Sequence, residues 1–485
     1  MSQPKILFTH AYFMGEDPKE QQINKPYPPL GILYLSAWMD QHNYENDVFD
    51  TTFSTPAEQQ QYLLQEQPDI IAIYTNLMTK LGVIDLLKFI RSEADLKHSL
   101  VVLGGPDLRY NIQNYLDAGS DVLVIGEGEQ SMLELVQAVD KGLRPHFGHI
   151  PGLAFRYEEG EIIQTVKRSH LKAVDELPMP NRHKIDLHRY LDIWKTHHGR
   201  SSITVSTQRG CPYTCRWCST AVYGQSYRRR SAKKVAEELV FLKKNYQPDQ
   251  VWFVDDVFSV SHKWLAAFRD EVIAQDAIIP FECITRAERL KPEVISMLKK
   301  SGCFRIWIGA ESGSQRILDA MDRRVEANRV KDMIIETRRQ GIETGTFIML
   351  GYPGEAEKDV EDTLAYLKAA NPDLFTITIA YPIKGTGLYK DVEDQITKQP
   401  NWFESTDRDI DFARTYPKPY YDYAVRWVVN GVHLHKQKTQ GNLLSIQALK
   451  HAVKVFLARI GMRWYRGFQP KAIKHELATP VPESV

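Results

Sequence analysis

Three cysteines lie close together in a chain that otherwise alternates apolar runs with helical stretches. They are Cys211, Cys215 and Cys218, in the sequence Gly-Cys-Pro-Tyr-Thr-Cys-Arg-Trp-Cys-Ser. A 4Fe-4S cluster that only transfers electrons is held by four cysteines, whereas three thiolates leave one iron open to bind a small molecule. The spacing C-x3-C-x2-C therefore predicts an iron-sulfur cluster with three protein ligands.

A structural zinc site is the alternative use of these cysteines. A Cys3His site would take His197 or His198 as its fourth ligand. Zinc sites more often contain two C-x2-C pairs, and no second pair is present among the five cysteines of the chain. The other two, Cys283 and Cys303, lie in or beside apolar runs. We interpret them as buried structural thiols, while a radical quencher or methyl acceptor is the functional alternative.

The length and charge of the chain exclude several classes of protein. At 485 residues it is long enough for two or three domains. Lysine plus arginine equals aspartate plus glutamate at 61 each, so no global field attracts nucleic acid. No signal sequence and no apolar run long enough to cross a bilayer is found. A cluster held by thiolates needs a reducing compartment, so we expect a cytoplasmic enzyme without disulfides.

The pattern of apolar runs predicts two α/β units in sequence. Over residues 1–140, apolar runs alternate with helical segments, which is typical of a doubly wound parallel sheet. Residues 141–200 are predicted to be a connector containing a hairpin that turns at Glu158 and Glu159. Six further runs over residues 201–400 predict a partial (β/α)6 barrel, with the cysteines after its first strand. Residues 401–485 are expected to form a helical extension.

The cysteine segment resembles that of the radical S-adenosylmethionine superfamily, in which the cofactor chelates the open iron and is cleaved to a 5'-deoxyadenosyl radical. Trp217 precedes the third cysteine, as is common in that family. Polar residues then follow successive apolar runs, and such residues converge on the mouth of a barrel. By resemblance, Asp255 or Asp256 would bind the cofactor ammonium and Arg286 its carboxylate, although the Gly-Gly-Glu form of the acidic segment is absent.

Two later strand ends extend this resemblance. Glu311 and Ser312 match the family's ribose and methionine segment, and Gly351 lies in a segment similar to the one that contacts adenine. The sixth run ends in residues 381–386, whose polar side chains would face substrate. For each residue alone, a helix cap or solvated loop is the alternative interpretation.

The N-terminal unit resembles the cobalamin-binding domain found in one group of these enzymes. The motif residues of that domain, together with the segment typical of radical enzymes that carry it, are Thr75, Asn76, Leu77, Gly104, Gly105, Gly126 and Glu127. Small residues there would leave room for the nucleotide tail of cobalamin. The Asp-x-His-x-x-Gly motif is missing, because Phe8 and Phe13 replace its Asp and Gly around His10, so we expect no histidine below the cobalt. A sheet without cobalamin is the alternative.

The resemblance predicts a methyltransferase that acts on an unactivated carbon and uses a 4Fe-4S cluster, S-adenosylmethionine and cobalamin. The alternatives are an oxidative cyclase or rearrangement enzyme of the anaerobic tetrapyrrole-cyclase type, or a non-catalytic cobalamin or iron-sulfur sensor. A transfer RNA methylthiolation enzyme fits less well, because residues 1–210 contain no cysteine.

The partners implied are a small-molecule or lipid substrate and an external one-electron reductant such as flavodoxin or ferredoxin, with no nucleic acid. Residues 443–474 mix apolar and basic side chains, among them Lys471, and such a helix can contact a membrane surface weakly or pack on its own domain. The run Arg228 to Arg230 could bind a phosphate or open a helix.

Overall fold

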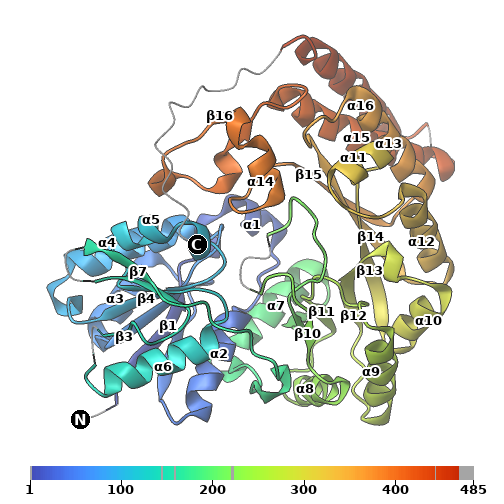
Figure 1. Ribbon diagram of the computed structural model, residues 1–485. Coiled ribbons are helices and arrows are strands. Elements are labelled where there is room, and N and C mark those ends of the chain that lie inside the picture. The colour runs from blue at the N-terminus through green and yellow to red at the C-terminus, as the bar shows by residue number, and fades with distance from the viewer. Residues whose placement is uncertain (1–2, 144–145, 158–159, 220–222, 443, 469–485) are drawn as a thin grey trace.

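Two parallel β-sheets, one on each side of a short connector, organise the chain (Figure 1). The structure is a computed structural model that describes residues 3–143, 146–157, 160–219, 223–442 and 444–468. Glu158, Glu159 and Lys471, which the sequence analysis singled out, lie outside the described residues. Among the described residues, the model contains no helix of the length and apolar character needed to cross a membrane.

The first sheet has five parallel strands in the order β2-β1-β3-β4-β5, followed by the antiparallel hairpin β6-β7. The sequence predicted the hairpin but not its pairing with β5. The chain leaves β1 toward β2 on one side and then adds β3 to β5 on the other, and ligands of such sheets bind at the carboxyl ends beside this reversal. The strands are Ile6–His10, Asn46–Phe49, Ile70–Tyr74, Leu100–Gly104, Val122–Val124, Leu153–Arg156 and Ile162–Gln164.

Side chains of the central strands alternate between two buried faces, which explains their nearly continuous apolar sequence. Ile6 and Phe8 pack with α2 and α6 on one face, whereas Leu7 packs with α3, α4 and α5 on the other. Thr55 caps α3 with a capping box and Pro56 begins that helix. The helices are α1 Pro18–Ile23, α2 Leu30–Gln41, α3 Pro56–Glu66, α4 Lys80–Ser92, α5 Ile112–Asp117 and α6 Gly128–Asp140.

The second sheet has six parallel strands in the order β15-β14-β13-β12-β11-β8. Strands consecutive along this series are neighbours, and helices cover the outer face, so the sheet is an open half-barrel (Figure 1). Its strands are β8 Ser202–Val205, β11 Gln250–Phe253, β12 Phe281–Thr285, β13 Cys303–Glu311, β14 Glu343–Leu350 and β15 Leu374–Ile379.

Amphipathic helices between these strands bury their apolar side chains in one large core. Serine caps begin α8 and α9, where Ser231 and Ser261 each accept a hydrogen bond from the backbone amide three residues on in the helix. Before and between the strands lie α7 Leu187–His198, α8 Ala232–Asn245, α9 His262–Ala274, α10 Pro292–Lys300, α11 Gln315–Ala320, α12 Ala327–Arg339 and α13 Glu357–Ala370.

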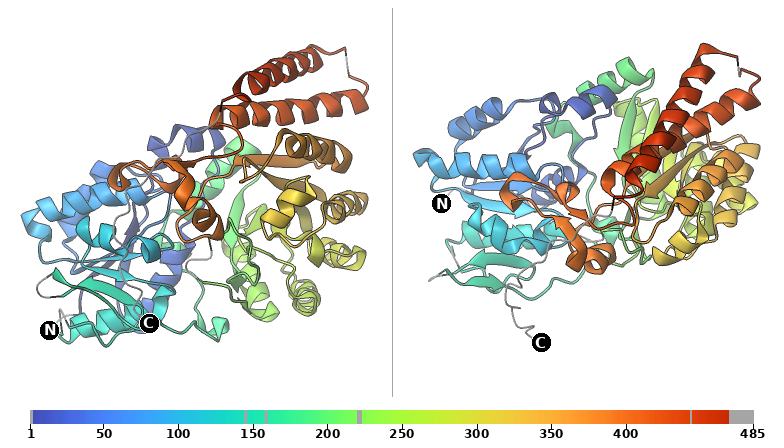
Figure 2. Two further views of the ribbon diagram at one scale, coloured as in Figure 1. Left: turned by 45° about the horizontal axis from the view of Figure 1, so that its top comes forward. Right: turned by 90° about the horizontal axis from the view of Figure 1, so that it is seen from above.

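The C-terminal region begins with a small segment between the sheets and ends in a helical pair. Figure 2 shows α15 and α16 at the periphery, with their distal end extending away from both sheets.

Two short antiparallel strands, β9 and β10, flank the cysteine segment. The remaining elements are β9 Gln208–Arg209, β10 Arg228–Arg229, α14 Gly387–Val392, β16 Ile396–Lys398, β17 Asp411–Phe412, α15 Lys418–Thr439 and α16 Ile446–Tyr465.

The predicted fold class is confirmed. A doubly wound parallel sheet, a six-stranded partial barrel and a helical C-terminal region all occur in the predicted order. Cys283 and Cys303 are buried in β12 and β13, as expected for structural thiols.

Candidate active site

The cysteine segment lies at the carboxyl end of the half-barrel, directly after β8 and β9. Cys211 and Cys215 are half-buried and Cys218 is exposed. Its start requires a glycine, because Gly210 has a φ of +80° and a Cβ there would lie 2.3 Å from Ser226 Oγ. The backbone amide of Arg216 donates to the Met321 carbonyl at 3.2 Å, and the Arg216 carbonyl accepts from the Leu388 amide at 2.7 Å. The loop is therefore held by the turn after α11 and by the start of α14.

The surroundings of the loop favour the protonated form of its thiols. Desolvation by neighbouring protein atoms, with Asp256 as the second cause, raises the pKa of Cys218 to about 12 although part of this residue is open to solvent, and desolvation also raises the pKa of Cys211. Metal-bound cysteines are deprotonated, so a cluster would reverse this preference. Arg286 adds a positive charge, because its Nη1 lies 3.2 Å from Cys215 Sγ and its guanidinium stacks on Tyr213.

The geometry does not support the zinc alternative. His197 and His198 end α7, before β8, whereas the cysteines follow that strand. The His198 ring is instead within hydrogen-bonding distance of the carbonyls of Ile23 and Asn24. Within the described residues, no three His, Cys, Asp or Glu side chains converge on a single metal position. Separate irons of a 4Fe-4S cluster bind the separate thiolates, so a cluster does not require that convergence.

A cavity of about 320 Å³ opens beside the cysteine segment, between the two sheets. Its walls come from the start of α2, the loop after β4, the segment around β9 and the end of β11. Among its lining residues are Gly31, Tyr34, Pro106, Glu129, Gln208, Arg209, Cys211, Tyr223 and Asp256.

A second cavity of about 420 Å³ lies at the carboxyl ends of the first sheet and is largely apolar. It is lined by β1, β3, β4 and β5 on one side and by α2 and α6 on the other, with Phe8, Ala72, Tyr74, Val102, Gly104, Gly105, Val124, Gly126 and Met132 among the residues. The two cavities adjoin, because both are lined by Leu30, Gly31, Pro106, Glu129 and Tyr223.

Glycines keep the mouth of this second cavity open. Gly105 has a φ of +136°, and a Cβ there would lie 1.8 Å from the Thr75 carbonyl oxygen. A Cβ on Gly104 would meet no protein atom within 4 Å. The close approach of two strand ends at Gly105 and the open space at Gly104 fit the entry of a bulky ligand beside the sheet.

Two family models match the regions that form these cavities. The model described as the Radical SAM superfamily matches residues 205–367, and the model described as the B12 binding domain matches residues 22–136. The chain belongs to the radical S-adenosylmethionine superfamily and carries a B12-binding domain. Its cofactors are a 4Fe-4S cluster, S-adenosylmethionine and cobalamin. The three cysteines and the glycine-lined cavity fit these groups.

Relatives of this radical enzyme include methyltransferases and cyclases. It is 28% identical to an uncharacterized methyltransferase of Pyrococcus horikoshii, over 78% of this chain and 82% of that protein. It is 24% identical to the anaerobic magnesium-protoporphyrin IX monomethyl ester cyclase of Rubrivivax gelatinosus, over 81% and 70%.

Two solved structures share its fold. The cobalamin-dependent S-adenosylmethionine radical enzyme OxsB with aqua-cobalamin bound matches 94% of this chain and 72% of its own, with a TM-score of 0.75 and 16% identity. The radical S-adenosylmethionine methyltransferase TsrM of Kitasatospora setae matches 81% and 78%, with a TM-score of 0.67 and 17% identity.

The two acidic residues that follow β11 differ in their burial and in their hydrogen-bond partners. Asp255 is buried and accepts hydrogen bonds from the Thr207 amide at 2.7 Å and the Gln208 amide at 3.2 Å, and it pairs with Arg229. Its carboxylate therefore holds the segment that leads into the cysteine loop. Both residues line the cavity beside Cys211, but Asp256 is exposed, so it is the carboxylate of the two that is open to a ligand.

Of the remaining predicted site residues in this unit, some line a cavity and others are hydrogen-bonded within the protein. Glu311 and Trp217 line a cavity of about 140 Å³ inside the half-barrel, together with Tyr381. Burial raises the pKa of Glu311 to about 7, against the opposing effect of two arginines. Ser312 is buried with its hydroxyl near the Thr363 hydroxyl at 3.3 Å, and the amide of Gly351 donates to the Glu355 carboxylate. Ser312 and Gly351 therefore shape the loops instead of presenting free polar groups.

The motif after β3 shapes the cavity mouth indirectly. The Thr75 amide donates to the Gly104 carbonyl at 2.7 Å, and Asn76 Oδ1 accepts from two amides of the following turn. Leu77 is half-buried. Thr75, Asn76 and Leu77 are not among the described residues that line the second cavity, whereas Tyr74 is one of them.

His10 is occupied by neighbours in the protein. Its Nε2 lies 2.9 Å from Asp50 and its Nδ1 lies 2.9 Å from Thr51 Oγ1. Both ring nitrogens of His10 therefore have partners in the protein, and the absence of a histidine ligand below the cobalt stays a prediction.

The acidic segment after β5 pairs with arginines of the other unit, which the sequence analysis missed. Glu127 pairs with Arg228 and accepts a hydrogen bond from the Leu171 amide at 2.9 Å. Glu129 forms a buried pair with Arg209. Gly126, with a φ of +96°, directs this segment away from β5. No local pattern in the sequence predicts these pairs, because about 80 to 100 residues separate the partners.

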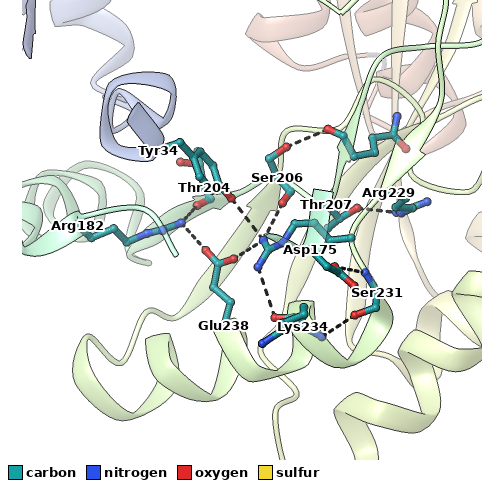
Figure 3. A network of polar contacts seen from close by, with 12 residues as sticks. Tyr34, Asp175, Arg182, Thr204, Ser206, Thr207, Arg229, Ser231, Lys234 and Glu238 are labelled. Atoms are coloured by element: carbon teal, nitrogen blue, oxygen red, sulfur yellow. Dashed lines mark hydrogen bonds and ion pairs between the residues drawn. The ribbon is translucent and has the colours of Figure 1, made fainter. Parts of the chain in front are cut away.

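The arginine run also has internal partners. Arg229 donates to the Phe258 carbonyl at 2.6 Å, and Arg230 pairs with Glu238 and donates to the Ser206 carbonyl at 3.0 Å. Figure 3 shows Glu238 between the barrel and Arg182 of the connector, which pairs with it at 3.0 Å. The structure therefore does not support the phosphate interpretation of this run, and α8 begins just after it.

Proposed function

We propose that this enzyme methylates an unactivated carbon of a small-molecule or lipid substrate. The observation that carries the proposal is the adjoining pair of cavities, one at the glycine-lined end of the first sheet and one at the cysteine segment. When bound, the cofactors supply a methyl group carried on cobalt and a carbon radical that removes hydrogen. A shared cavity would let both act on one substrate carbon.

The chain's own residues would bind and orient these groups. Asp256 would accept the ammonium of S-adenosylmethionine, because its exposed carboxylate lines the cavity beside Cys211, and Arg286 would hold the loop through Cys215 and add positive charge there. Trp217 and Glu311 face the interior of the half-barrel. Asp255, Ser312 and Gly351 maintain the loops that carry them, and the backbone around Gly104 and Gly105 leaves space for cobalamin.

This assignment divides the chain into a cobalamin unit over residues 1–140, a connector over 141–200, a radical unit over 201–400 and a C-terminal extension over 401–485. Radical S-adenosylmethionine enzymes require an external one-electron reductant, for which flavodoxin or ferredoxin is suited. Nucleic acid is not expected as a partner, since the chain has no net charge. Because the cluster needs a reducing compartment, the enzyme would act in the cytoplasm.

An oxidative cyclase is the second candidate, because cyclases of Rubrivivax gelatinosus and Synechocystis are among the relatives. The two functions predict different fates for the methyl group of S-adenosylmethionine. A methyltransferase places it on the product, whereas a cyclase yields a product without it.

The test begins with the iron, sulfide and cobalamin content of protein prepared without oxygen from cells supplied with cobalamin. Four irons and one cobalamin per chain are expected. A Cys218→Ala variant, which removes an exposed thiol, should lose the cluster and keep cobalamin. Iron without cobalamin would contradict the methyl-transfer proposal, and a substrate screen with labelled methyl donor would separate the two candidates.

A further inference from the structure

The C-terminal helix α16 has two different apolar faces. Its inner face packs on α15, where Ala448, Ala458 and Met462 are buried and Tyr465 stacks on Tyr423. Arg459 secures this face through Glu357 at 2.8 Å and Glu361 at 2.7 Å. The helix is therefore attached to its own domain by one side only.

The opposite side carries large apolar side chains that face solvent. Their spacing of three or four residues forms a continuous stripe along the helix. The outer stripe consists of Ile446, Leu449, Val453, Phe456, Leu457, Ile460 and Trp464, which are 47% to 76% exposed. An exposed apolar stripe over a helix of 20 residues, which is about 30 Å long, is typical of a docking surface.

Basic side chains flank the outer stripe, and acidic ones are missing. Lys450, Lys454 and Arg463 are exposed, and residues 441–468 contain no aspartate or glutamate. In the part of the chain that the structure describes, the ion pairs of this helix involve Arg459 and Arg466. The three flanking cations thus have no acidic partner on their own helix.

We propose that α16 docks on the surface of an anionic lipid bilayer, with the outer stripe in the interfacial region and the three flanking cations among the lipid headgroups. A helix with a basic flank and Trp, Phe and Leu on its apolar side lies in the plane of such an interface. Figure 2 shows that the helical pair projects from the molecule, so the bilayer can reach it without meeting either sheet.

Charge favours a lipid surface over a second copy of the chain. Pairing two outer stripes would bring Lys450, Lys454 and Arg463 of both copies together, and the helix offers no carboxylate to compensate. Anionic headgroups attract the same cations. The docking surface shares no residue with the cavities at the two sheets, so this inference is independent of the proposed methyl transfer.

The test is flotation of the full chain with vesicles of phosphatidylglycerol and phosphatidylcholine, compared with phosphatidylcholine alone. We expect binding to the anionic vesicles, at least tenfold weaker binding to the neutral ones, and release by high salt. The double variant Phe456→Ser, Leu457→Ser should bind at least tenfold less, and Lys450→Glu, Lys454→Glu should lose the preference for anionic lipid.

A matched control is Ile273→Ser, Ile335→Ser, which removes two exposed apolar side chains from α9 and α12 and should leave vesicle binding unchanged. Absence of wild-type binding, or equal binding to both kinds of vesicle, would overturn the proposal even if a variant failed to fold. So would a dimer that the Phe456 and Leu457 substitutions dissociate, or binding that appears only after residues 469–485 are removed.

Discussion

The glycine pair at the end of β4 gives a sharp test of the cobalamin cavity. In Gly105→Ala, the new Cβ would lie 1.8 Å from the Thr75 carbonyl oxygen, whereas ordinary contacts begin near 3.4 Å. The ends of β3 and β4 would have to separate by about 1.6 Å, the difference between these two distances. The φ of +136° adds backbone strain of about 1–3 kcal/mol, and overpacking adds a similar amount. We expect a loss of about 2–6 kcal/mol in unfolding free energy.

Gly104→Ala is the matched control, because its Cβ would meet no protein atom within 4 Å. Its stability should stay within about 0.5 kcal/mol of wild type. Thermal unfolding of the apoprotein measures stability, and absorbance titration measures cobalamin affinity. Both variants should bind cobalamin more weakly, Gly105→Ala because the strand ends move and Gly104→Ala because its methyl group enters the cavity. Wild-type stability in Gly105→Ala would refute the strain argument, and wild-type affinity in Gly104→Ala would refute the placement of the ligand.

Three other substitutions test the cluster loop, the contact between units and a buried carboxyl group. Arg286→Met removes the guanidinium 3.2 Å from Cys215, and we expect faster loss of the cluster's visible absorbance in air with unchanged cobalamin binding. Arg209→Met leaves Glu129 buried without its partner, so the unfolding free energy should fall by about 3–5 kcal/mol in denaturant titration, and a loss below about 1 kcal/mol would contradict the pairing. Burial raises the pKa of Glu355 from 4.5 to about 8, which means that folding favours its protonated form. Its contribution is fully present below pH 4.5 and is lost as the pH rises to about 8, by on the order of 5 kcal/mol, and Glu355→Gln should flatten this part of the stability profile.

The fold could be predicted from the sequence because the central strands of the first sheet are buried on both faces. Runs such as Ile70–Tyr74 contain few polar residues, and alternation with helical segments leaves a parallel sheet as the simple arrangement. The cysteine loop could be placed for the same reason, since it directly follows an apolar run. The hairpin at β6 and β7 was predicted as a hairpin, but its pairing with β5 depends on which sheet edge is free.

The roles of individual site residues were harder to predict. Asp255 and Asp256 are adjacent and chemically identical, and only the packing of Thr207 and Arg229 shows which carboxylate is occupied. Glu127 lies in a segment that resembles part of the cobalamin-binding domain, yet its carboxylate pairs with Arg228 of the other unit. Such contacts depend on the relative placement of the sheets, which local patterns do not determine.

The central claim is that cobalamin and the cluster meet at one cavity between the two sheets. Electron paramagnetic resonance of protein loaded with cob(II)alamin and a reduced cluster tests it most directly, because nearby unpaired electrons alter each other's signals. We expect two mutually coupled signals in the wild type, and an uncoupled cobalt signal in Cys218→Ala, which should retain cobalamin and lose the cluster. Two independent signals in the fully loaded wild type would contradict the shared cavity and, with it, the methyl-transfer proposal.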